Sequence, residues 1–303
     1  MIILSVSNLK KRISKSISKQ SFMAYTFVIP AALLLFVFLV VPAIMALAFS
    51  FTDFYILRPE GISFIGIKNY VTLFQDELFL KCLWNTSYFV FVLVPIEGII
   101  ALGLAILVNK NIIGKTFFRT SYFAPVITSI AVVAILWSFI YNPNDGLINA
   151  ALNALGIPSQ MFLRSASQAM NSIIFMTIWQ GVGIQMIIFL AGLKQIPTEL
   201  YEASAIDGAT AIQQFFKITI PGLKNVISFI VIWITIQAFK LFTQPYIMTY
   251  GGPENSTRTL VYYIYQQGFQ YKKAGYASCM AMVFFVIVVC VAMVQKRILI
   301  KKE

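Results

Sequence analysis

Two ionisable residues, Glu97 and Lys240, lie inside long apolar stretches of this 303-residue chain. An apolar stretch of about 20 residues can cross a bilayer as a helix, and a charge inside it is costly enough to suggest a function. At about 1.5 Å per residue, Glu97 and Lys240 lie roughly 16 and 21 Å into the membrane, counted from the ends of their stretches that are expected to face the cytoplasm. Two hypotheses follow. In the first, the charges are structural: Glu97 and Lys240 form a buried ion pair, or the lysine snorkels to the membrane surface. In the second, Lys240 lines a cavity and binds hydroxyls or an anionic group of a solute.

Uncharged polar residues in the same stretches add candidates for such a cavity. One stretch contains Thr177, Gln180, Gly181 and Gln185. Thr177, Gly181 and Ile184 recur at i, i+4 and i+7, which places them on one face of a helix. Gly181 has no side chain, so a ligand or a second helix can come close to it. The spacing therefore predicts one helix face that a ligand or a neighbouring helix can approach.

The composition excludes several kinds of site. The chain contains no histidine, which excludes a histidine-based catalytic centre or metal site. Cys82, Cys279 and Cys290 are scattered, which indicates packing roles rather than a disulfide framework or a thiolate metal site. Hydrophobic residues make up 59% of the chain and charged residues 11%, against about 25% charged residues in soluble domains. We therefore expect an all-α membrane protein with several spans and neither a catalytic nor a metal site.

The tripeptide Gly114-Lys115-Thr116 is similar to the end of a phosphate-binding loop. The earlier glycine of such a loop would be at position 109, which is Asn109, and no strand is expected before it. We therefore expect that this chain binds no nucleotide or other cofactor, and that any energy it uses comes from a partner.

Six stretches are long and apolar enough to cross about 30 Å of hydrocarbon. Each must be helical, because backbone groups in lipid need hydrogen-bond partners within the segment. Pro95 and Pro125 predict kinks in the second and third stretches, either for packing or as hinges. Within a membrane domain of residues 23–298, the expected spans are 23–50, 85–108, 117–141, 171–192, 224–246 and 275–296, with a basic segment 1–22 before them, a polar loop 193–222 between the fourth and fifth, and a tail 299–303.

Basic residues set the expected orientation. With the N-terminus in the cytoplasm, the segments on that side hold roughly twice as many Lys and Arg residues as the segments on the other side, as the positive-inside rule requires. The apolar run over 22–51 is far longer than that of a signal peptide, so we interpret it as the first span. We therefore expect both termini in the cytoplasm and residues 142–168 and 246–272 outside. This bias accounts for much of the net charge of +12 without nucleic acid.

A polar, helix-forming segment separates the fourth and fifth stretches. Thr198 can cap a helix whose first turn carries acidic side chains. The pair Asp207-Gly208 is typical of a helix end, a second short helix is expected over 210–218, and Pro221 should end it. Two short helices with a glycine joint form a compact knob that suits a cleft on another protein. An ordinary amphipathic loop is the alternative.

The spacing of residues in this segment resembles the EAA loop of the membrane-spanning subunits of ABC importers. In that family the loop is a cytoplasmic coupling element that docks on an ATPase subunit. The chain departs from the family pattern at two positions: Ser204 replaces the usual second alanine, and Ile220 replaces the leucine that usually precedes the proline. The resemblance implies that this chain hydrolyses nothing and that ATP and Mg are bound by two ATPase partner subunits. The residues expected to serve the coupling are Glu202, Ala203, Ser204, Asp207, Gly208, Ile218 and Pro221.

Other segments resemble the permeases of carbohydrate importers of the maltose type, including those for oligosaccharides and sn-glycerol-3-phosphate. The most specific is the Gly-Gly-Pro of 251–253 with the Thr- and Tyr-rich stretch 256–269, and the segments 103–125 and 142–149 are also similar. The resemblance implies a heterodimer with a second, homologous permease subunit. It also implies an extracytoplasmic solute-binding protein and a multi-pass location in a bacterial or archaeal plasma membrane.

In the maltose-type class, sugar contacts come from the fourth and fifth spans. Two of the matching positions, Ala238 and Leu241, are apolar here, which leaves open whether this subunit or its partner holds the sugar. Trp137 and Tyr141 in the third span either stack on a sugar ring or anchor the helix at the interface. The candidate pathway residues are Trp137, Tyr141, Thr177, Gln180, Gly181, Ile184, Gln237, Lys240, Leu241 and Gln244.

We therefore expect the permease subunit of an ATP-driven importer of a carbohydrate, with an oligosaccharide as the first choice. Import of sn-glycerol-3-phosphate or another small polar solute is the alternative. A secondary transporter driven by an ion gradient is a further alternative, which only Glu97 supports. A membrane-embedded enzyme has no support, because no nucleophile, base and metal ligands cluster in the sequence.

Overall fold

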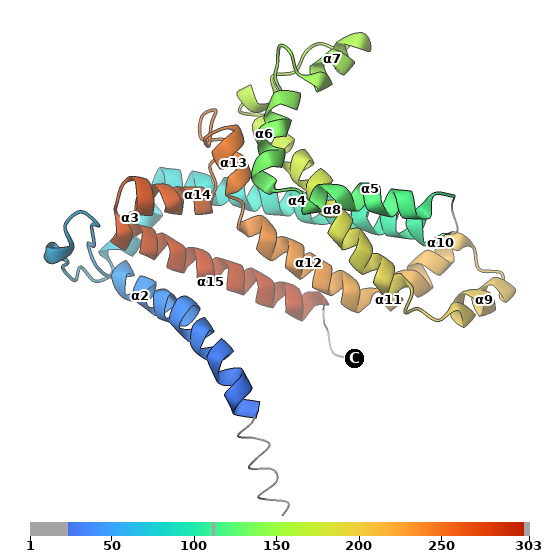
Figure 1. The fold of residues 1–303 in the computed structure, drawn as a ribbon, viewed down its shortest axis with the longest axis horizontal. Coiled ribbons are helices and arrows are strands. Elements are labelled where there is room, and N and C mark those ends of the chain that lie inside the picture. The colour runs from blue at the N-terminus through green and yellow to red at the C-terminus, as the bar shows by residue number, and fades with distance from the viewer. Residues whose placement is uncertain (1–23, 111–112, 300–303) are drawn as a thin grey trace, which may run out of the picture.

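The computed structural model describes residues 24–110 and 113–299, and these residues form an assembly of helices (Figure 1). Five helices in it are long and apolar enough to cross a membrane: Ala24–Ser50, α4 (Glu77–Asn109), α8 (Ala169–Leu193), Lys224–Met248 and α15 (Ala274–Leu299). The expected all-α class is confirmed. The basic segment 1–22 and most of the tail 299–303 lie outside the described residues.

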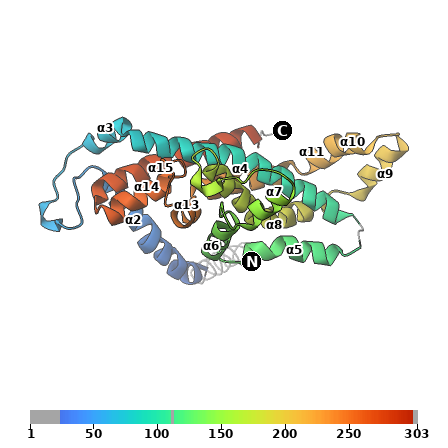
Figure 2. The ribbon, with the colours of Figure 1, turned by 90° about the horizontal axis from the view of Figure 1, so that it is seen from above.

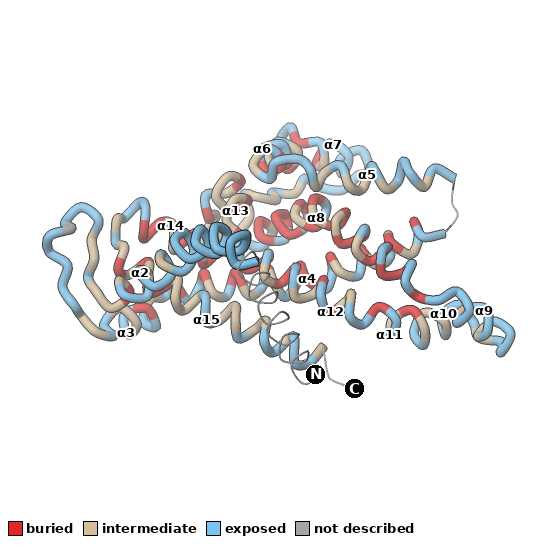
Figure 3. The backbone as a smooth tube through the Cα atoms, turned by 60° about the horizontal axis from the view of Figure 1, so that its bottom comes forward, coloured by how far each residue is buried: buried red, intermediate tan, exposed pale blue. Residues whose placement is uncertain are grey.

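Helix α8 is the centre of the bundle. It packs along α4 and also contacts α5 (Lys115–Ile127) and α12 (Lys224–Phe239). Figure 3 shows buried residues concentrated on α8, with α4 and α12 contributing the facing sides. A helix that is apolar all round belongs in a protein interior or in lipid, and here protein surrounds most of it.

The first long helix stands apart from this core. It includes the π-helical turn η1 (Phe36–Val40) and α2 (Val41–Ser50), and α2 contacts α15. Its mean hydropathy is 2.9, and of its residues only Ser50 is buried. So much exposed apolar surface suits contact with lipid or with another membrane helix.

The third expected span forms two helices, α5 and α6 (Ile130–Ile140), which lie at 101° to each other. The expected third span is therefore a sharply bent pair of helices rather than a single kinked helix. Thr128 and Ser129 between the helices are extended, and α6 turns away from the bundle axis, packs against the segment after α12 and leads to α7 (Leu147–Ala154) (Figure 1). Pro125 lies inside α5, three positions before the break, so the missing N–H of the proline does not explain it alone.

The fifth expected span is also interrupted. Helix α12 ends at Phe239, and α13 (Thr243–Met248) starts after a short non-helical stretch. A turn follows α13 at Gly251, whose φ of +82° suits glycine. The remaining elements are η2 (Pro59–Gly61), α3 (Lys68–Gln75), η3 (Phe162–Arg164), α14 (Leu260–Tyr265) and η5 (Gln266–Gln270).

Asp76 joins three segments at the end of the bundle where α3 and α14 lie. Its Oδ1 accepts hydrogen bonds from the backbone N–H groups of Leu78 (2.9 Å) and Phe79 (3.2 Å), which caps α4. Its Oδ2 accepts from the hydroxyls of Tyr263 and Tyr276, both at 2.7 Å. Burial acts to raise the pKa of this carboxyl, but the four hydrogen bonds outweigh it and hold the pKa below the ordinary value for Asp.

We expect Asp76→Asn to lower the free energy of unfolding by about 1–2 kcal/mol, because the amide weakens several charge-assisted hydrogen bonds of a partly exposed group. The folded pKa of Asp76 lies below its unfolded value, so this contribution is present above about pH 4 and is lost as the pH falls further. The measurement is thermal unfolding of the purified protein in detergent. The control is Asp53→Asn, since the exposed Asp53 bonds only Ser63. Equal losses in both variants would contradict the role of Asp76.

Candidate functional site

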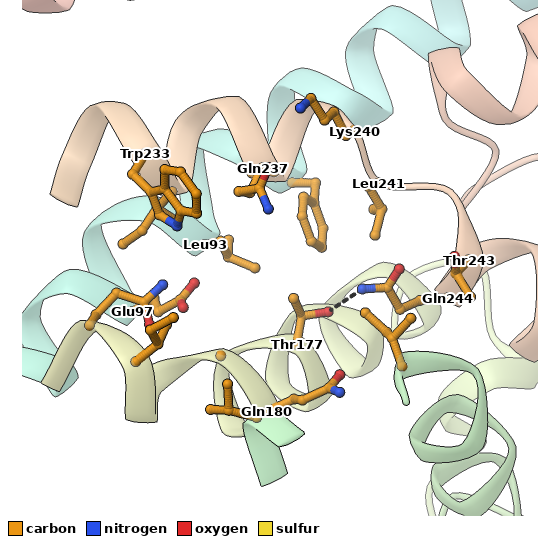
Figure 4. A pocket seen from close by; sticks show the side chains of 18 of the residues that line it. Leu93, Glu97, Thr177, Gln180, Trp233, Gln237, Lys240, Leu241, Thr243 and Gln244 are labelled. Atoms are coloured by element: carbon orange, nitrogen blue, oxygen red, sulfur yellow. Dashed lines mark hydrogen bonds between the residues drawn. The ribbon is translucent and has the colours of Figure 1, made fainter. Parts of the chain in front are cut away.

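A cavity of about 500 Å³ lies in the middle of the bundle between α4, α8 and α12 (Figure 4). Both helix breaks reach it. Val126, Thr128 and Ile130 line it from the break between α5 and α6, and residues 240–244 line it from the break after α12. The interruptions in regular helix packing therefore coincide with the space that a solute can occupy.

Most of the residues predicted for the pathway come together here, although they come from separate helices. Those that line the cavity are Thr177, Gln180, Gly181, Ile184, Gln237, Lys240, Leu241 and Gln244. The one-face pattern of Thr177, Gly181 and Ile184 on α8 is confirmed, since all three line the same space.

Trp137 and Tyr141 lie elsewhere. Both are buried, with ring centroids 5.1 Å apart, and Trp137 packs edge-on against Phe175 and Trp179. The Tyr141 hydroxyl donates to a backbone carbonyl of α8 at 3.0 Å. The structure thus gives these two aromatic residues packing roles and does not support their stacking on a solute in this cavity.

Other lining residues were not among the predicted ones. Trp233 and Phe242 line the cavity, but in an apolar stretch nothing marks a side chain as facing a cavity rather than lipid. Thr128 also lines the cavity, and it could have been predicted, because a polar residue inside an apolar run indicates a side chain that faces away from lipid. Glu97 was considered as an ion-pair partner and as support for an ion-coupled transporter, and not as a residue that lines the cavity.

Side-chain hydrogen bonds satisfy the backbone at both helix breaks. Gln180 Nε2 donates to the carbonyl of Thr128 at 3.0 Å, and Thr259 Oγ1 donates to the carbonyl of Leu241 at 2.6 Å. A carbonyl freed inside an apolar environment needs such a partner. Gln244 Nε2 also lies 3.5 Å from Thr177 Oγ1, which links the second break to α8 across the cavity (Figure 4).

Glu97 and Lys240 lie on different sides of the cavity, and no ion pair joins them (Figure 4). Glu97 is only 3% exposed and packs over Gly181, where an added Cβ would be 2.6 Å from Glu97 Oε1. Lys240 is exposed, in the turn that ends α12. The hypothesis of a buried Glu97–Lys240 pair is therefore not supported.

The three cysteines form no disulfide. Cys82 and Cys279 are buried in one apolar cluster near α3 and α14, which agrees with packing roles, and Cys290 is exposed. Among the described residues, no three His, Cys, Asp or Glu side chains converge on a point where they could hold a metal ion.

The polar segment between α8 and α12 projects beyond the bundle at the end opposite α3 (Figures 1 and 2). Its elements are α9 (Thr198–Ile206), α10 (Ala211–Gln214), the π-turn η4 (Phe215–Thr219) and α11 (Ile220–Gly222). Of the residues predicted for coupling, Glu202, Ala203, Asp207, Gly208 and Pro221 are exposed, and Ser204 and Ile218 are partly buried.

Internal hydrogen bonds fix the two arms of this knob. Gln214 Nε2 donates to the backbone carbonyl of Tyr201 (3.1 Å) and to Ser204 Oγ (2.9 Å). The hydroxyls of Tyr201 and Thr219 lie 2.9 Å apart. Gly208, with φ +78°, forms the joint between the arms. The segment is therefore a compact two-arm knob rather than an open loop.

Two local expectations for this segment are wrong. Thr198 is the first residue of α9, and the capping position is Pro197, which makes no side-chain bond. The side-chain cap is instead at Thr210, in a capping box with Gln213. Pro221 does not end the second arm, because it occupies the first turn of α11, where the missing N–H of a proline costs little.

The chain matches the family model described as "Binding-protein-dependent transport system inner membrane component" over residues 98–301. That range holds both breaks, the knob and the parts of the cavity wall that α8 and α12 contribute. The chain belongs to this family. It is therefore a multi-pass membrane protein and the permease component of a transport system, as the sequence predicted.

Three similar proteins illustrate the family. The sulfoquinovosyl glycerol transport system permease protein SmoG of Agrobacterium fabrum is 35% identical over 90% of this chain and 89% of its own length. The sn-glycerol-3-phosphate transport system permease protein UgpA of Shigella flexneri is 34% identical over 94% of this chain and 96% of its own length. The structure of a bacterial alginate ABC transporter, in complex with an alginate pentasaccharide-bound periplasmic protein, shares the fold with a TM-score of 0.81. The match covers 94% of this chain and 97% of the other, at 23% identity.

We expect Lys240→Met to leave the stability of the protein unchanged, because Lys240 is exposed and unpaired with Glu97. Thermal unfolding in detergent measures this. A buried pair would behave differently, since removing one partner typically costs about 3–5 kcal/mol, and Glu97→Gln would then rescue the variant. Destabilisation with such rescue would contradict the arrangement in Figure 4. If Lys240 binds the solute, transport falls in the stable variant; unchanged transport would leave it a snorkelling lysine.

Proposed function

We propose that this chain is one of two permease subunits of an ATP-driven importer of carbohydrates, with an oligosaccharide as the first choice. A binding protein outside the membrane delivers the sugar, and two ATPase subunits, which bind ATP and Mg, drive the cycle. The second permease is a related but different chain. The observation that carries the proposal is the central cavity, because it joins the predicted polar residues of α8 and of the α12 region in one otherwise largely apolar space.

The knob supports the coupling part of this proposal. It carries an exposed apolar surface that includes Leu200 (51% exposed), Ile206 (87%) and Ile212 (71%). Large apolar side chains exposed at the tip of a polar segment mark a protein contact surface. Helix α8 leads from the cavity to this knob (Figure 1). A partner that moves the knob therefore pulls on the helix that forms one wall of the cavity.

The relatives bear on the substrate. SmoG is named for sulfoquinovosyl glycerol, a sulfonated sugar glycoside, and UgpA for sn-glycerol-3-phosphate, a phosphorylated polyol. A cavity of about 500 Å³ accommodates a small saccharide and equally a glycerol phosphate, which remains the alternative. An ion-coupled secondary transporter is disfavoured because the family is one of binding-protein-dependent systems.

Glu202→Lys and Gly208→Pro should uncouple ATP hydrolysis from transport without unfolding the chain. Glu202 is exposed on the knob, and the φ of +78° at Gly208 is inaccessible to proline. The measurement is ATPase activity stimulated by sugar-loaded binding protein in the reconstituted complex, which should fall at least about tenfold, a loss of roughly 1.4 kcal/mol.

Matched controls exist away from the knob. Glu254→Lys reverses another exposed acid, and Gly156→Pro alters another exposed glycine, with φ +74° and no atom near its missing Cβ. Both control variants, if they fold, should retain the ATPase activity that sugar-loaded binding protein stimulates. Unchanged stimulation and uptake in both knob variants would refute the coupling role.

The knob and both termini should face the cytoplasm. A cysteine at position 213 in a protein without native cysteines should react with an impermeant maleimide in inverted vesicles, and not in intact cells, because the capping-box residue Gln213 lies exposed on the knob. A cysteine at Asn153, exposed on α7, is the opposite control and should react in intact cells. Labelling of position 213 from outside would overturn the orientation.

A further inference from the structure

A chain of aromatic rings leads out of the cavity toward exposed surface. Phe242 lines the cavity, and its ring centroid lies 5.1 Å from that of Tyr265, which in turn lies 5.5 Å from that of Phe269. The ring of Phe242 also stacks on that of Tyr246 at 5.2 Å, and Tyr246 lies 6.0 Å from Tyr250. The rings therefore form two branches that meet at the wall of the cavity.

The exposure of the rings rises along both branches with distance from the cavity. Phe242, Tyr246 and Tyr265 are partly buried, whereas Tyr250 is 70% exposed and Phe269 is 65% exposed. Both exposed rings belong to the segment that is expected to face outside, and α14 lies at the end of the bundle opposite the knob (Figure 1). We propose that these rings form an entry path, on which a saccharide moves into the cavity with its sugar rings stacked on the aromatic faces. This inference rests on the proposed function and adds a path and saccharide-binding residues to it.

The backbone at Tyr250 is strained, and burial of its ring does not offset the strain. Tyr250 has a φ of +52°, in the left-handed region that a bulky side chain rarely adopts. The turn around it is fixed by threonines, since the hydroxyls of Thr249 and Thr257 lie 2.7 Å apart and Thr257 Oγ1 donates to the carbonyl of Gly252 at 2.9 Å. Strain that the surrounding structure maintains around an exposed side chain is typical of a functional position.

The buried ring of Tyr262 holds the path in place. Tyr262 is 3% exposed, and its ring meets those of Phe242 and Tyr246 edge-on, at 6.0 and 5.6 Å. Gly251 allows the turn to pack on this ring, because an added Cβ there would lie 2.9 Å from Tyr262 Cε1. Rings that are fixed before a ligand arrives lose little freedom on binding, which favours the bound state.

A saccharide is the solute that this path fits best. The faces of a sugar ring carry C–H groups that pack on aromatic faces, while its hydroxyls stay in water. The steps of 5.1 and 5.5 Å are about the length of one sugar unit, so an oligosaccharide can contact neighbouring rings at once. Glycerol phosphate has no ring to stack. A belt of aromatic residues at the membrane surface would face lipid, whereas these rings continue into the cavity through Phe242.

The first test identifies what occupies the two exposed rings. The photoreactive residue p-benzoylphenylalanine replaces Phe269 or Tyr250 in the assembled complex, which is reconstituted in lipid with its binding protein. Tritiated oligosaccharides of glucose, xylose and arabinose are added, and the samples are irradiated with and without a non-hydrolysable ATP analogue. We expect tritium on this chain at both positions. The control is Phe91, which is 82% exposed on α4 outside the cavity and should crosslink to lipid without tritium.

The absence of tritium at position 250 or at position 269, whatever else is crosslinked there, would overturn the proposal. Crosslinks to lipid alone would identify a membrane belt, and crosslinks to the second permease alone would identify a subunit contact. Equal tritium at position 91 would also overturn it, because the labelling would then not depend on the path.

The second test asks whether stacking is the interaction that matters. Phe269→Leu and Tyr250→Leu keep an apolar side chain without an aromatic face, and Phe269→Trp and Tyr250→Phe keep the face. We expect each leucine variant to take up the dilute crosslinking oligosaccharide about two- to tenfold more slowly than the native complex, and the aromatic variants to match it. Equal uptake by the leucine and aromatic variants would contradict the path.

The two tests distinguish this proposal from the importer assignment. Crosslinking needs no ATP hydrolysis, so tritium at both positions without ATP-driven uptake would support the path and contradict the importer. ATP-driven uptake that the leucine variants do not slow would preserve the importer and exclude the path.

Discussion

The architecture depends on how the carbonyls freed at two helix breaks are satisfied in an apolar environment. Each unpaired carbonyl there would cost several kcal/mol, so a break persists only where a side chain supplies a donor. Gln180 supplies it to Thr128, and Thr259 supplies it to Leu241. The breaks in turn keep regular packing from filling the centre of the bundle. The cavity is thus a consequence of two hydrogen bonds, and one of the donors, Gln180, also lines it.

Helix α8 connects this centre to the knob. It carries Gln180 and Gly181 at the cavity and leads at its end to α9, whose joint at Gly208 is stiffened by the bonds of Gln214 to the first arm. The other end of the bundle is tied together through Asp76 and two tyrosines. One end is therefore an exposed, internally rigid contact surface and the other a network of long-range bonds. Such an arrangement suits a protein that is moved at one end while its other end stays assembled.

Periodicity and composition were sufficient for most of the long helices and for the shared face of Thr177, Gly181 and Ile184, because apolar runs and helical spacing are local signals. Helix α4 begins at Glu77 rather than at residue 85, because Asp76 caps it there and a hydropathy average does not detect a cap. The break at Thr128 depends on Gln180, 52 residues away, and no local rule contains that contact. The same limit applies to Glu97, because its position over Gly181 depends on a contact between two helices.

The central claim is that this cavity belongs to a permease whose transport is driven by ATP on partner subunits. The most direct measurement is uptake of labelled oligosaccharides into proteoliposomes that contain the complete complex, with the binding protein added outside and ATP enclosed inside. The account predicts accumulation that needs both ATP and the binding protein and that persists when ionophores collapse all ion gradients. Accumulation that follows an imposed proton or sodium gradient, and proceeds without ATP, would contradict it.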